Sequence, residues 1–438
     1  MSRSTEKADD LSRALRAALP SASAYVLALS GGADSTAVLH LLHGRLPLRC
    51  LHVNHGLGPQ AAALEAAAIS ACAQLGLPLR VLRIAQSPPQ SNIEDWARTQ
   101  RYALLRSALR AGEVLMTAHH REDQVETFLL AAARGSGPQG LRGLLPLQAF
   151  GPGWLARPAL GLKKADLRPH AGPEGEAWVE DQSNADGRFD RNRLRADVLP
   201  TLVRWRPAAL VGLADAASHQ AQLLEGWQAL AGAYVRSLQG PSPHSWQLPP
   251  LLALPDAALL PLLRLICAQA GAPPPPARML SQLRSELGEA RADAEPQLRW
   301  RSWSLRRHRG LLHLLPPLPK RPPEEGLPLR SRRGQRSWPG GGQVRWEAPV
   351  EEGLQLRSGV MAARVGAGAG VRVDEAFRQL GVPPWVRQRW PQLWAEGSLR
   401  AIAGWGFAAA DSGWVLHWEQ PPPWARYWLE QAAAEAFR

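Results

Sequence analysis

The segment from residue 30 to residue 35 reads Ser-Gly-Gly-Ala-Asp-Ser and combines two glycines, two hydroxyls and a carboxylate. It follows an apolar run and opens a segment with helical spacing. A turn from a parallel strand into a helix exposes N–H groups at the positive end of the helix dipole, which favours a bound phosphate. The glycines let the backbone approach phosphate, the hydroxyls can donate hydrogen bonds, and the carboxylate is predicted to hold Mg²⁺. The predicted phosphate-binding residues are Ser30, Gly31, Gly32, Ala33, Asp34 and Ser35.

Two further polar clusters follow apolar runs. Asn54 and His55 come after the second run, and His119 and His120 come after the fourth. Strands that alternate with helices predict a parallel sheet, whose ligands bind beyond the carboxyl ends of the strands. We therefore expect these residues near the glycine-rich turn, with one histidine, predicted to be His120, facing the phosphates while the other packs or caps. The apolar runs are 25–30, 48–53, 79–84 and 114–118.

Two more kinds of charged residue are candidates for catalysis. Asp34 and Asp123 are distant in the sequence, but both are expected beyond strand ends, so both could reach one Mg²⁺. The alternative for Asp123 is a solvated charge on a helix. Arg98 and Arg101 are three residues apart and share one helix face. A guanidinium there could neutralise a leaving pyrophosphate or hold an adenylate, and a solvated basic face is the alternative.

Composition limits the class of protein. With 438 residues, 45% of them hydrophobic and 20% charged, the chain is expected to be globular with about two to four domains. No apolar run approaches the ~20 residues of a membrane span, and the N-terminus has no secretory pattern. The three cysteines form no CxxC pair, which predicts a cytosolic (cytoplasmic) protein with free thiols. A net charge of +13 indicates a polyanionic partner such as nucleic acid.

The pattern changes twice along the chain, near residues 205 and 320. We predict an α/β Rossmann-like domain over 1–205, a mainly helical domain over 206–320 and a small α+β domain over 321–438, with a helix near 373–380. The segment 299–315 is predicted to be a hairpin of two strands with a basic turn.

Arginines in three stretches are candidates for RNA contact, because arginine binds phosphate and the interleaved tryptophans can stack on unpaired bases. The first stretch, 191–195, contacts RNA or only closes the first domain. The second stretch, 301–309, also has the alternation that any half-buried strand would show. Trp385, beside the third stretch, is expected to pack, which leaves Arg387 and Arg389 exposed. The candidates are Arg191, Arg193, Arg195, Arg301, Arg306, Arg307, Arg309, Arg387 and Arg389.

The glycine-rich turn resembles the PP-loop, SGGxDS, of enzymes that split ATP between its α and β phosphates. Over nearly its whole length the chain resembles the bacterial tRNA(Ile)-lysidine synthetases. Glu122 stands where the family usually has Asp, and Leu145 where it often has Met. The resemblance is carried by LHVNHGL (51–57), NIEDWARTQRY (92–102), the signature from TAHHREDQ to GLRGL (117–144), ARPALGLKKADL (156–167), EDQSNADGRFDRNRLRADVLP (180–200) and GVPPWVRQRWPQLW (381–394).

The resemblance implies adenylation of the C2 oxygen of the wobble cytidine in CAU-anticodon tRNA(Ile), followed by attack of free L-lysine. It implies ATP and Mg²⁺ and no membrane, and it leaves open whether the chain forms a homodimer. The turn, with Asn54 and His55, would bind ATP, and the acid that binds the lysine ammonium could be Asp34, Asp123 or Glu126. The catalytic residues that it implies are Asp34, Asp123, Arg98 and His120.

Three other functions compete with this one. A PP-loop tRNA thiolase usually needs cysteine pairs, which Cys50, Cys72 and Cys267 do not form. A synthetase that makes GMP or NAD would lack the basic C-terminal half. A non-catalytic RNA-binding protein would not need the intact Ser30, Asp34 and Ser35. ATP–pyrophosphate exchange that depends on tRNA would distinguish an enzyme from a pure binder.

Overall fold

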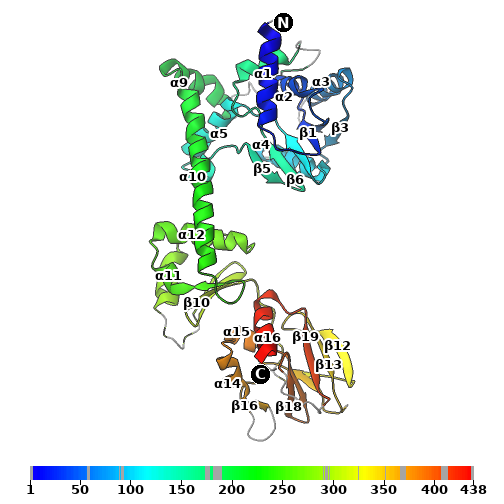
Figure 1. The fold of residues 1–438 in the computed structure, drawn as a ribbon, viewed down its shortest axis with the longest axis vertical. Helices are drawn as coiled ribbons and strands as arrows, with labels where there is room; N and C mark the ends of the chain where they lie inside the picture. Colours follow the sequence, from blue (N-terminus) through cyan, green and yellow to red (C-terminus); the bar gives the residue numbers. More distant parts are fainter. Residues whose placement is uncertain are drawn as a thin grey trace. The chain divides into compact units, whose positions relative to one another are not determined.

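The computed structural model describes residues 3–56, 60–87, 89, 93–172, 178–180, 190–289, 291, 294, 296–323, 325–350, 352–365, 371–405 and 413–435. It contains two compact units, Met1–Trp227 and Gln228–Arg438 (Figure 1).

The first unit is built on a six-stranded sheet with the order β3-β2-β1-β4-β6-β5. The four strands predicted from the apolar runs are present and parallel. Two short strands were not predicted: β6 continues the parallel order beside β4, and β5 runs antiparallel at the edge. The strands are β1 (Ala24–Ala28), β2 (Leu48–Asn54), β3 (Leu79–Arg83), β4 (Glu113–Met116), β5 (Leu147–Phe150) and β6 (Gly153–Ala156).

Both faces of this sheet are covered. Because successive strand residues point to opposite faces, Leu27 packs with Leu15 of α1 and Leu42 of α2, while Val26 packs with Leu105 of α4. A parallel sheet buried on both faces places its ligands at the strand ends. The helices of the unit are α1 (Arg3–Ala17), α2 (Ala33–Leu42), α3 (Gln60–Gln74), α4 (Ile93–Ala108), α5 (Arg121–Ala133), α6 (Pro138–Leu141), α7 (Lys164–Leu167), α8 (Asp190–Arg193) and α9 (Leu199–Trp205).

The region after the sheet contains more β structure than predicted. The long helix expected there is α10 (Ala209–Ser237), and it is followed by α11 (Leu248–Leu252), α12 (Asp256–Gln269) and α13 (Met279–Gln282). The predicted two-stranded hairpin is instead part of a four-stranded antiparallel sheet, β7-β10-β9-β8. The chain turns twice rather than once, because Arg301 and Arg309 both take positive φ values, 50° and 48°. The strands are β7 (Ser245–Gln247), β8 (Gln297–Trp300), β9 (Trp303–His308) and β10 (Leu311–Leu315).

The C-terminal part of the second unit is a small α+β arrangement, as predicted. Its sheets have the orders β11-β14-β17-β18, β12-β13-β19 and β15-β16. Trp390 and Phe377 are fully buried in its core, and the predicted helix is α14 (Val373–Gln379). In the described part of the chain, no helix is both long enough and apolar enough to cross a membrane. The remaining elements are β11 (Leu327–Pro328), β12 (Arg333–Ser337), β13 (Gln343–Glu347), β14 (Gln355–Arg357), β15 (Arg364–Val365), β16 (Val371–Arg372), α15 (Pro384–Arg387), β17 (Gln392–Ala395), β18 (Ser398–Ile402), β19 (Val415–Glu419) and α16 (Pro423–Glu435).

Candidate active site

The glycine-rich turn joins β1 to α2, and its shape requires glycine at one position. Gly31 has a φ of +84°, in the left-handed region that favours glycine. A Cβ at this position would overlap the backbone carbonyl of Leu64 in α3. The Gly31 carbonyl also accepts a hydrogen bond from the Val179 amide at 3.0 Å. The turn is therefore fixed between α3 and the segment around residue 179.

The two serines of the turn hold its shape. The Ser35 hydroxyl accepts a hydrogen bond from the Ser30 amide at 3.1 Å and lies 2.9 Å from the Ser30 hydroxyl. It donates to the Gly32 carbonyl at 3.1 Å, and the Gly32 amide donates to the Ser30 hydroxyl at 3.3 Å. Because these hydroxyls are used within the turn, the backbone N–H groups at the start of α2 are the groups best placed to bind a phosphate.

His120, at the N-terminus of α5, connects acids from two strand ends. Its side chain is buried, and its Nε2 atom lies 3.6 Å from Oδ2 of Asp34 and 3.4 Å from Oδ2 of Asp123. Its Nδ1 atom lies 3.0 Å from Oε2 of Glu122. Burial alone would lower the pKa of His120, but the carboxylates of Asp34, Glu122 and Asp123 raise it to about 10. The side chain is therefore a buried imidazolium at neutral pH.

The adjacent histidine, His119, is neutral at neutral pH. Burial lowers the pKa of His119 to about 3, although the charge of Asp123 acts in the other direction. The His119 Nδ1 atom lies 2.8 Å from the Thr117 hydroxyl. A neutral ring and an imidazolium therefore follow one another at the end of β4.

Two buried acids of α5, Asp123 and Glu126, are paired with two arginines of the motif at residues 180–200. Residues 181–189 of this motif lie outside the described residues. Arg191 and Arg195 place Nη2 atoms 2.9 Å and 3.1 Å from Oδ1 of Asp123. The Nε atoms of both arginines lie 2.5 Å from Glu126. Burial raises the pKa of Asp123, but His120, His119 and Arg191 outweigh it and lower the pKa to about 2. These two arginines, which are candidates for RNA contact or for closing the domain, form ion pairs within the cluster, whereas Arg193 is exposed.

Asp34 has a free carboxylate oxygen in this cluster. Its Oδ1 atom is buried and has no hydrogen-bond partner. Both oxygens of Asp123 are engaged, because Oδ1 accepts from the arginines and Oδ2 accepts from the His120 amide at 2.9 Å. Among the described residues, no three His, Cys, Asp or Glu side chains are arranged as metal ligands. Mg²⁺ needs only one or two carboxylates when phosphates and water complete its shell. Asp34 fits that requirement, and Asp123 would first have to release its arginines.

The end of β2 brings Asn54 close to α3. The Asn54 side chain donates to Glu65 at 2.6 Å and accepts from the Gly56 amide at 2.8 Å. Glu65 also forms an ion pair with Arg83 of β3. His55 follows Asn54 directly and is partly buried. Asn54 therefore shapes the chain after β2, next to the helix against which Gly31 packs.

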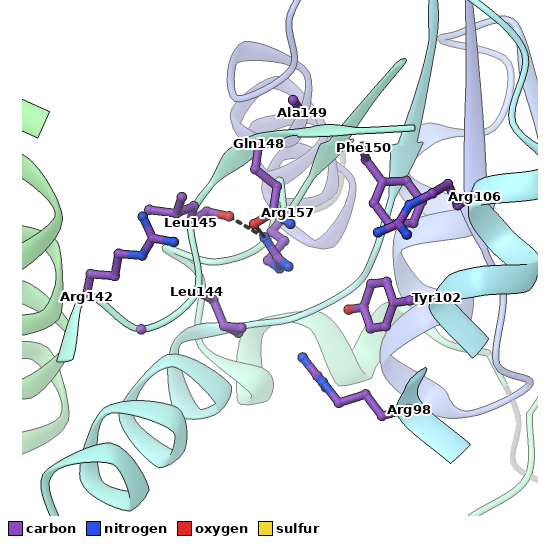
Figure 2. A pocket seen from close by; sticks show the side chains of 11 residues that line it. Arg98, Tyr102, Arg106, Arg142, Leu144, Leu145, Gln148, Ala149, Phe150 and Arg157 are labelled. Atoms are coloured by element: carbon purple, nitrogen blue, oxygen red, sulfur yellow. Dashed lines mark hydrogen bonds between the residues drawn. The ribbon is translucent and has the colours of Figure 1, made fainter. Parts of the chain in front are cut away.

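Arg98 lies in a cavity of about 360 Å³ formed by α4, β5 and the loops around them (Figure 2). Its guanidinium lies 5.2 Å from the centre of the Tyr102 ring, and that of Arg101 lies 5.6 Å from the same ring. We call Asp34, Glu122, Asp123 and Glu126 the acidic cluster. Among the described residues that line the cavity, none belongs to the glycine-rich turn or to the acidic cluster. Asp34, Asp123 and His120 therefore do not line the cavity that holds Arg98. The arginines that line the cavity are Arg98, Arg106, Arg142 and Arg157.

In the second unit, several candidate arginines bind backbone carbonyls. Arg307 donates to Leu287 at 3.0 Å, and Arg387 donates to Val382 at 2.6 Å. Arg309 donates to the carbonyl of Arg378, and the Arg306 guanidinium lies 5.3 Å from the centre of the Trp385 ring. Arg301 is exposed in the turn between β8 and β9.

The expectation that Arg389 is exposed is wrong. Its side chain is buried and donates to the carbonyls of Pro319 and Trp385, both at 2.9 Å. Burial, together with the charges of Arg321 and Arg306, lowers the pKa of Arg389 to about 10. Trp385 is itself buried, as expected for a packing residue.

Sequence reasoning missed three residues of the first unit. Arg157 and Arg142 line the cavity, and Glu122 pairs with His120. Arg157 follows a four-residue strand that shows no clear alternation, so its position beside α4 had no local signal. Glu122 was considered only as a departure from a motif, although a helix N-terminus favours an acid there.

Comparison with known proteins agrees with this architecture. Residues 4–202 match the model of a PP-loop domain, residues 247–313 that of a TilS substrate binding domain and residues 357–418 that of a TilS substrate C-terminal domain. The chain is 36% identical over 435 residues to tRNA(Ile)-lysidine synthase of Yersinia pestis, covering 90% of this chain and 94% of that protein. It is 35% identical over 453 residues to tRNA(Ile)-lysidine synthase of Pseudomonas aeruginosa, covering 94% and 97%. With a PP-loop turn, an acidic cluster beside it and this similarity along almost the whole length, the chain belongs to the tRNA(Ile)-lysidine synthase family.

Proposed function

We propose that the chain joins free L-lysine to C2 of the wobble cytidine of CAU-anticodon tRNA(Ile), with ATP cleaved to AMP and pyrophosphate. Membership of the family supports an ATP-dependent ligase that modifies tRNA. The structural observation that carries the proposal is the position of Asp34. Its unpartnered oxygen lies in the phosphate-binding turn, and its other oxygen faces the same imidazolium as Asp123.

In the first step the cytidine O2 attacks the α phosphorus of ATP. The new bond joins O2 to phosphorus, and the bond from the α phosphorus to the bridging oxygen breaks, so pyrophosphate leaves. The residues from Ser30 to Ser35 hold the phosphates through the amides at the start of α2. Asn54 and His55, at the end of β2, are proposed to complete the ATP site. The His120 imidazolium is a fixed positive charge beside Asp34 that stabilises developing negative charge.

In the second step the ε-amine of lysine attacks C2. A carbon–nitrogen bond forms, the bond from C2 to the adenylated oxygen breaks, and AMP leaves. The amine attacks as the neutral base, so a carboxylate first holds the ammonium and then accepts its proton. The candidate acids are Asp34, Asp123 and Glu126, of which the last two are paired with Arg191 and Arg195. If the ammonium of the substrate lysine binds to Asp123 or Glu126, it would replace the guanidinium of Arg191 or Arg195 there.

Mg²⁺ is proposed to bind at Asp34, where it would neutralise charge on the phosphates of ATP. Asp123 is the second proposed ligand, and it becomes available only when Arg191 and Arg195 move from its carboxylate. Arg98 is proposed to act on the anionic groups of the substrates from the cavity beside α4.

The domains are proposed to divide the work. Residues 1–205 carry the chemistry, residues 206–320 bind substrate, and residues 321–438 bind the tRNA. Arg193, Arg301 and Arg309 are exposed and are the proposed direct RNA contacts of the predicted set. The others, including Arg306 and Arg307, are proposed to support the RNA-binding surface. A homodimer stays a prediction that the mass of the protein in solution would check.

The function is tested by incubating the protein with ATP, Mg²⁺, labelled lysine and CAU-anticodon tRNA(Ile). Label in the RNA is expected, with one AMP and one pyrophosphate released for each lysine incorporated. Without lysine, adenylated tRNA and pyrophosphate should accumulate, and later addition of lysine should release AMP. Release of ADP and inorganic phosphate would indicate a kinase-like activation and would contradict the proposal.

A further inference from the structure

The cavity beside α4 is lined by arginines that have no role in the steps proposed at Asp34. It holds about 360 Å³, within the range of small-ligand sites. Four arginines line it, and no carboxylate does so among the described residues. Figure 2 shows Arg98, Tyr102 and Arg157 around the same space. Guanidinium groups that gather without an acid favour the binding of an anion.

Arg157 is the most deeply placed of these cations. It is 4% exposed, and one Nη atom donates to the carbonyl of Leu145 at 2.6 Å and lies 3.4 Å from Oε1 of Gln148. Its Nε atom is buried and has no hydrogen-bond partner. Burial and the charge of Arg98 lower the pKa of Arg157, and Tyr102 acts in the other direction. A buried charge with one unsatisfied donor is costly unless a ligand completes it.

Tyr102 and Phe150 form the apolar wall of the same cavity. The two rings meet edge to face, with centres 5.9 Å apart. The Tyr102 hydroxyl is buried beside Arg157 without a hydrogen-bond partner of good geometry. The Arg106 guanidinium lies 4.8 Å from the centre of the Phe150 ring. The Tyr102 hydroxyl is thus a second hydrogen-bond donor, beside Arg157, for an anion in the cavity.

The cavity is close to the acidic cluster but separate from the ATP turn. β4 and β6 are paired neighbours, and the Thr117 amide donates to the Ala156 carbonyl at 3.1 Å, so His119 and Arg157 follow adjacent strand ends. None of the residues from Ser30 to Ser35 lines the cavity. The phosphates of ATP have their own site in that turn, so the anion in the cavity comes from another substrate.

We propose that this cavity binds one backbone phosphate of the RNA substrate, next to the nucleotide whose base reaches the acidic cluster. The proposal rests on the proposed function, because it takes the RNA to be the substrate modified at that cluster. A guanidinium binds a phosphate through two parallel hydrogen bonds. Arg157 and Arg98 are positioned for such contacts, and Arg142, at the cavity edge, supplies a third positive charge. The carboxylate of free lysine is the other source of an anion, and the test below separates the two.

Arg142 is the residue to change, because it is half-buried and its removal leaves the core intact. Arg142→Gln is compared with Arg16→Gln, which makes the same charge change at an exposed position on α1. Arg142→Gln is expected to weaken tRNA binding by about tenfold and to lower the salt slope by about 0.7, one single-strand phosphate contact. Arg16→Gln should bind tRNA as the unchanged protein does. Arg157→Lys, which keeps the charge and loses the fork, should also weaken binding.

The phosphate itself is tested with full-length tRNAs assembled from synthetic halves, each carrying one neutral methylphosphonate in the anticodon loop. At one linkage the neutral group should weaken binding to the unchanged protein but cause no further loss with Arg142→Gln, since both changes remove the same contact. Equal losses with both proteins at every linkage would overturn the proposal. A change in the KM for lysine, with unchanged tRNA affinity, would also overturn it and assign the cavity to the lysine carboxylate. If instead the linkage effect appears but no lysine enters the RNA, the proposed function fails while the phosphate site stands.

Discussion

The Nε2 atom of His120 lies 3.6 Å from the carboxylate of Asp34, although the two residues follow different strands of the sheet. This contact joins the phosphate-binding turn to the head of α5. It explains why a buried histidine keeps its proton, since its imidazolium has carboxylates on both ring nitrogens. It also gives the candidate active site both signs of charge within a small space.

Changing Asp34→Asn keeps the shape of the side chain and removes the charge that faces His120 and is proposed to hold Mg²⁺. Lysine incorporation is expected to fall by about 100-fold or more, on the scale of losing one group that stabilises the transition state. Binding of tRNA should persist. Asp215→Asn, at an exposed position on α10, is the matched control. Normal turnover by the Asp34 variant would remove this residue from the mechanism.

The pKa values of His119 and His120 predict that their contributions to the free energy of unfolding change in opposite directions with pH. The folded-state pKa of His120 is raised to about 10, so its stabilisation is present below about pH 6.5 and is lost as the pH rises towards 10. The folded-state pKa of His119 is lowered to about 3, so its stabilisation is present above about pH 6.5 and is lost as the pH falls towards 3.

The measurement is urea unfolding of His119→Gln and His120→Gln between about pH 6 and about pH 9. Relative to the unchanged protein, the deficit of the His120 variant should shrink as the pH rises, by an amount on the order of a few kcal/mol. The deficit of the His119 variant should grow over the lower part of the same range. Deficits that change in the same direction would contradict the assigned charge states.

The close approach of Gly31 to α3 predicts a large effect of adding one methyl group. In Gly31→Ala the alanine would have to adopt a φ of +84°, which is strained for a residue with a side chain, and its Cβ would overlap the Leu64 carbonyl. Gly44→Ala is the control, since its φ is +70° but nothing lies within 4 Å of the added atom. The control should cost about 1 kcal/mol of unfolding free energy, and Gly31→Ala should cost roughly 1–3 kcal/mol more and weaken ATP binding. Equal costs would show that the overlap is relieved by a shift of α3.

Two arginines of the second unit should behave differently when changed to glutamine. Arg301→Gln alters an exposed turn, so it should lower the salt slope of tRNA binding by roughly 0.7 to 0.9 without changing the melting temperature. Arg389→Gln removes buried hydrogen bonds to Pro319 and Trp385, so it should cost about 1–3 kcal/mol of unfolding free energy. Thermal unfolding and tRNA titration at several salt concentrations measure both effects. A stable Arg389 variant with weakened tRNA binding would give that residue a direct RNA role.

The sequence by itself determined the features that a few neighbouring residues encode. The four apolar runs became the parallel strands β1 to β4, and the glycine-rich turn follows β1 as predicted. The reason is that strand periodicity, helix spacing and the need for a positive φ at Gly31 are local properties. The motifs that carry the family resemblance are also short and continuous.

Only the tertiary structure decided which charges meet. Arg191 and Glu126 are 65 residues apart, and no local pattern shows that they pair. His119 and His120 are adjacent and chemically identical, yet burial among different neighbours gives them opposite charge states. The cavity near Arg157 depends on β5 and β6, four residues each, which are too short to show a clear period. Pairing and desolvation depend on segments that are distant along the chain, so they become fixed only when the sheet and its helices pack together.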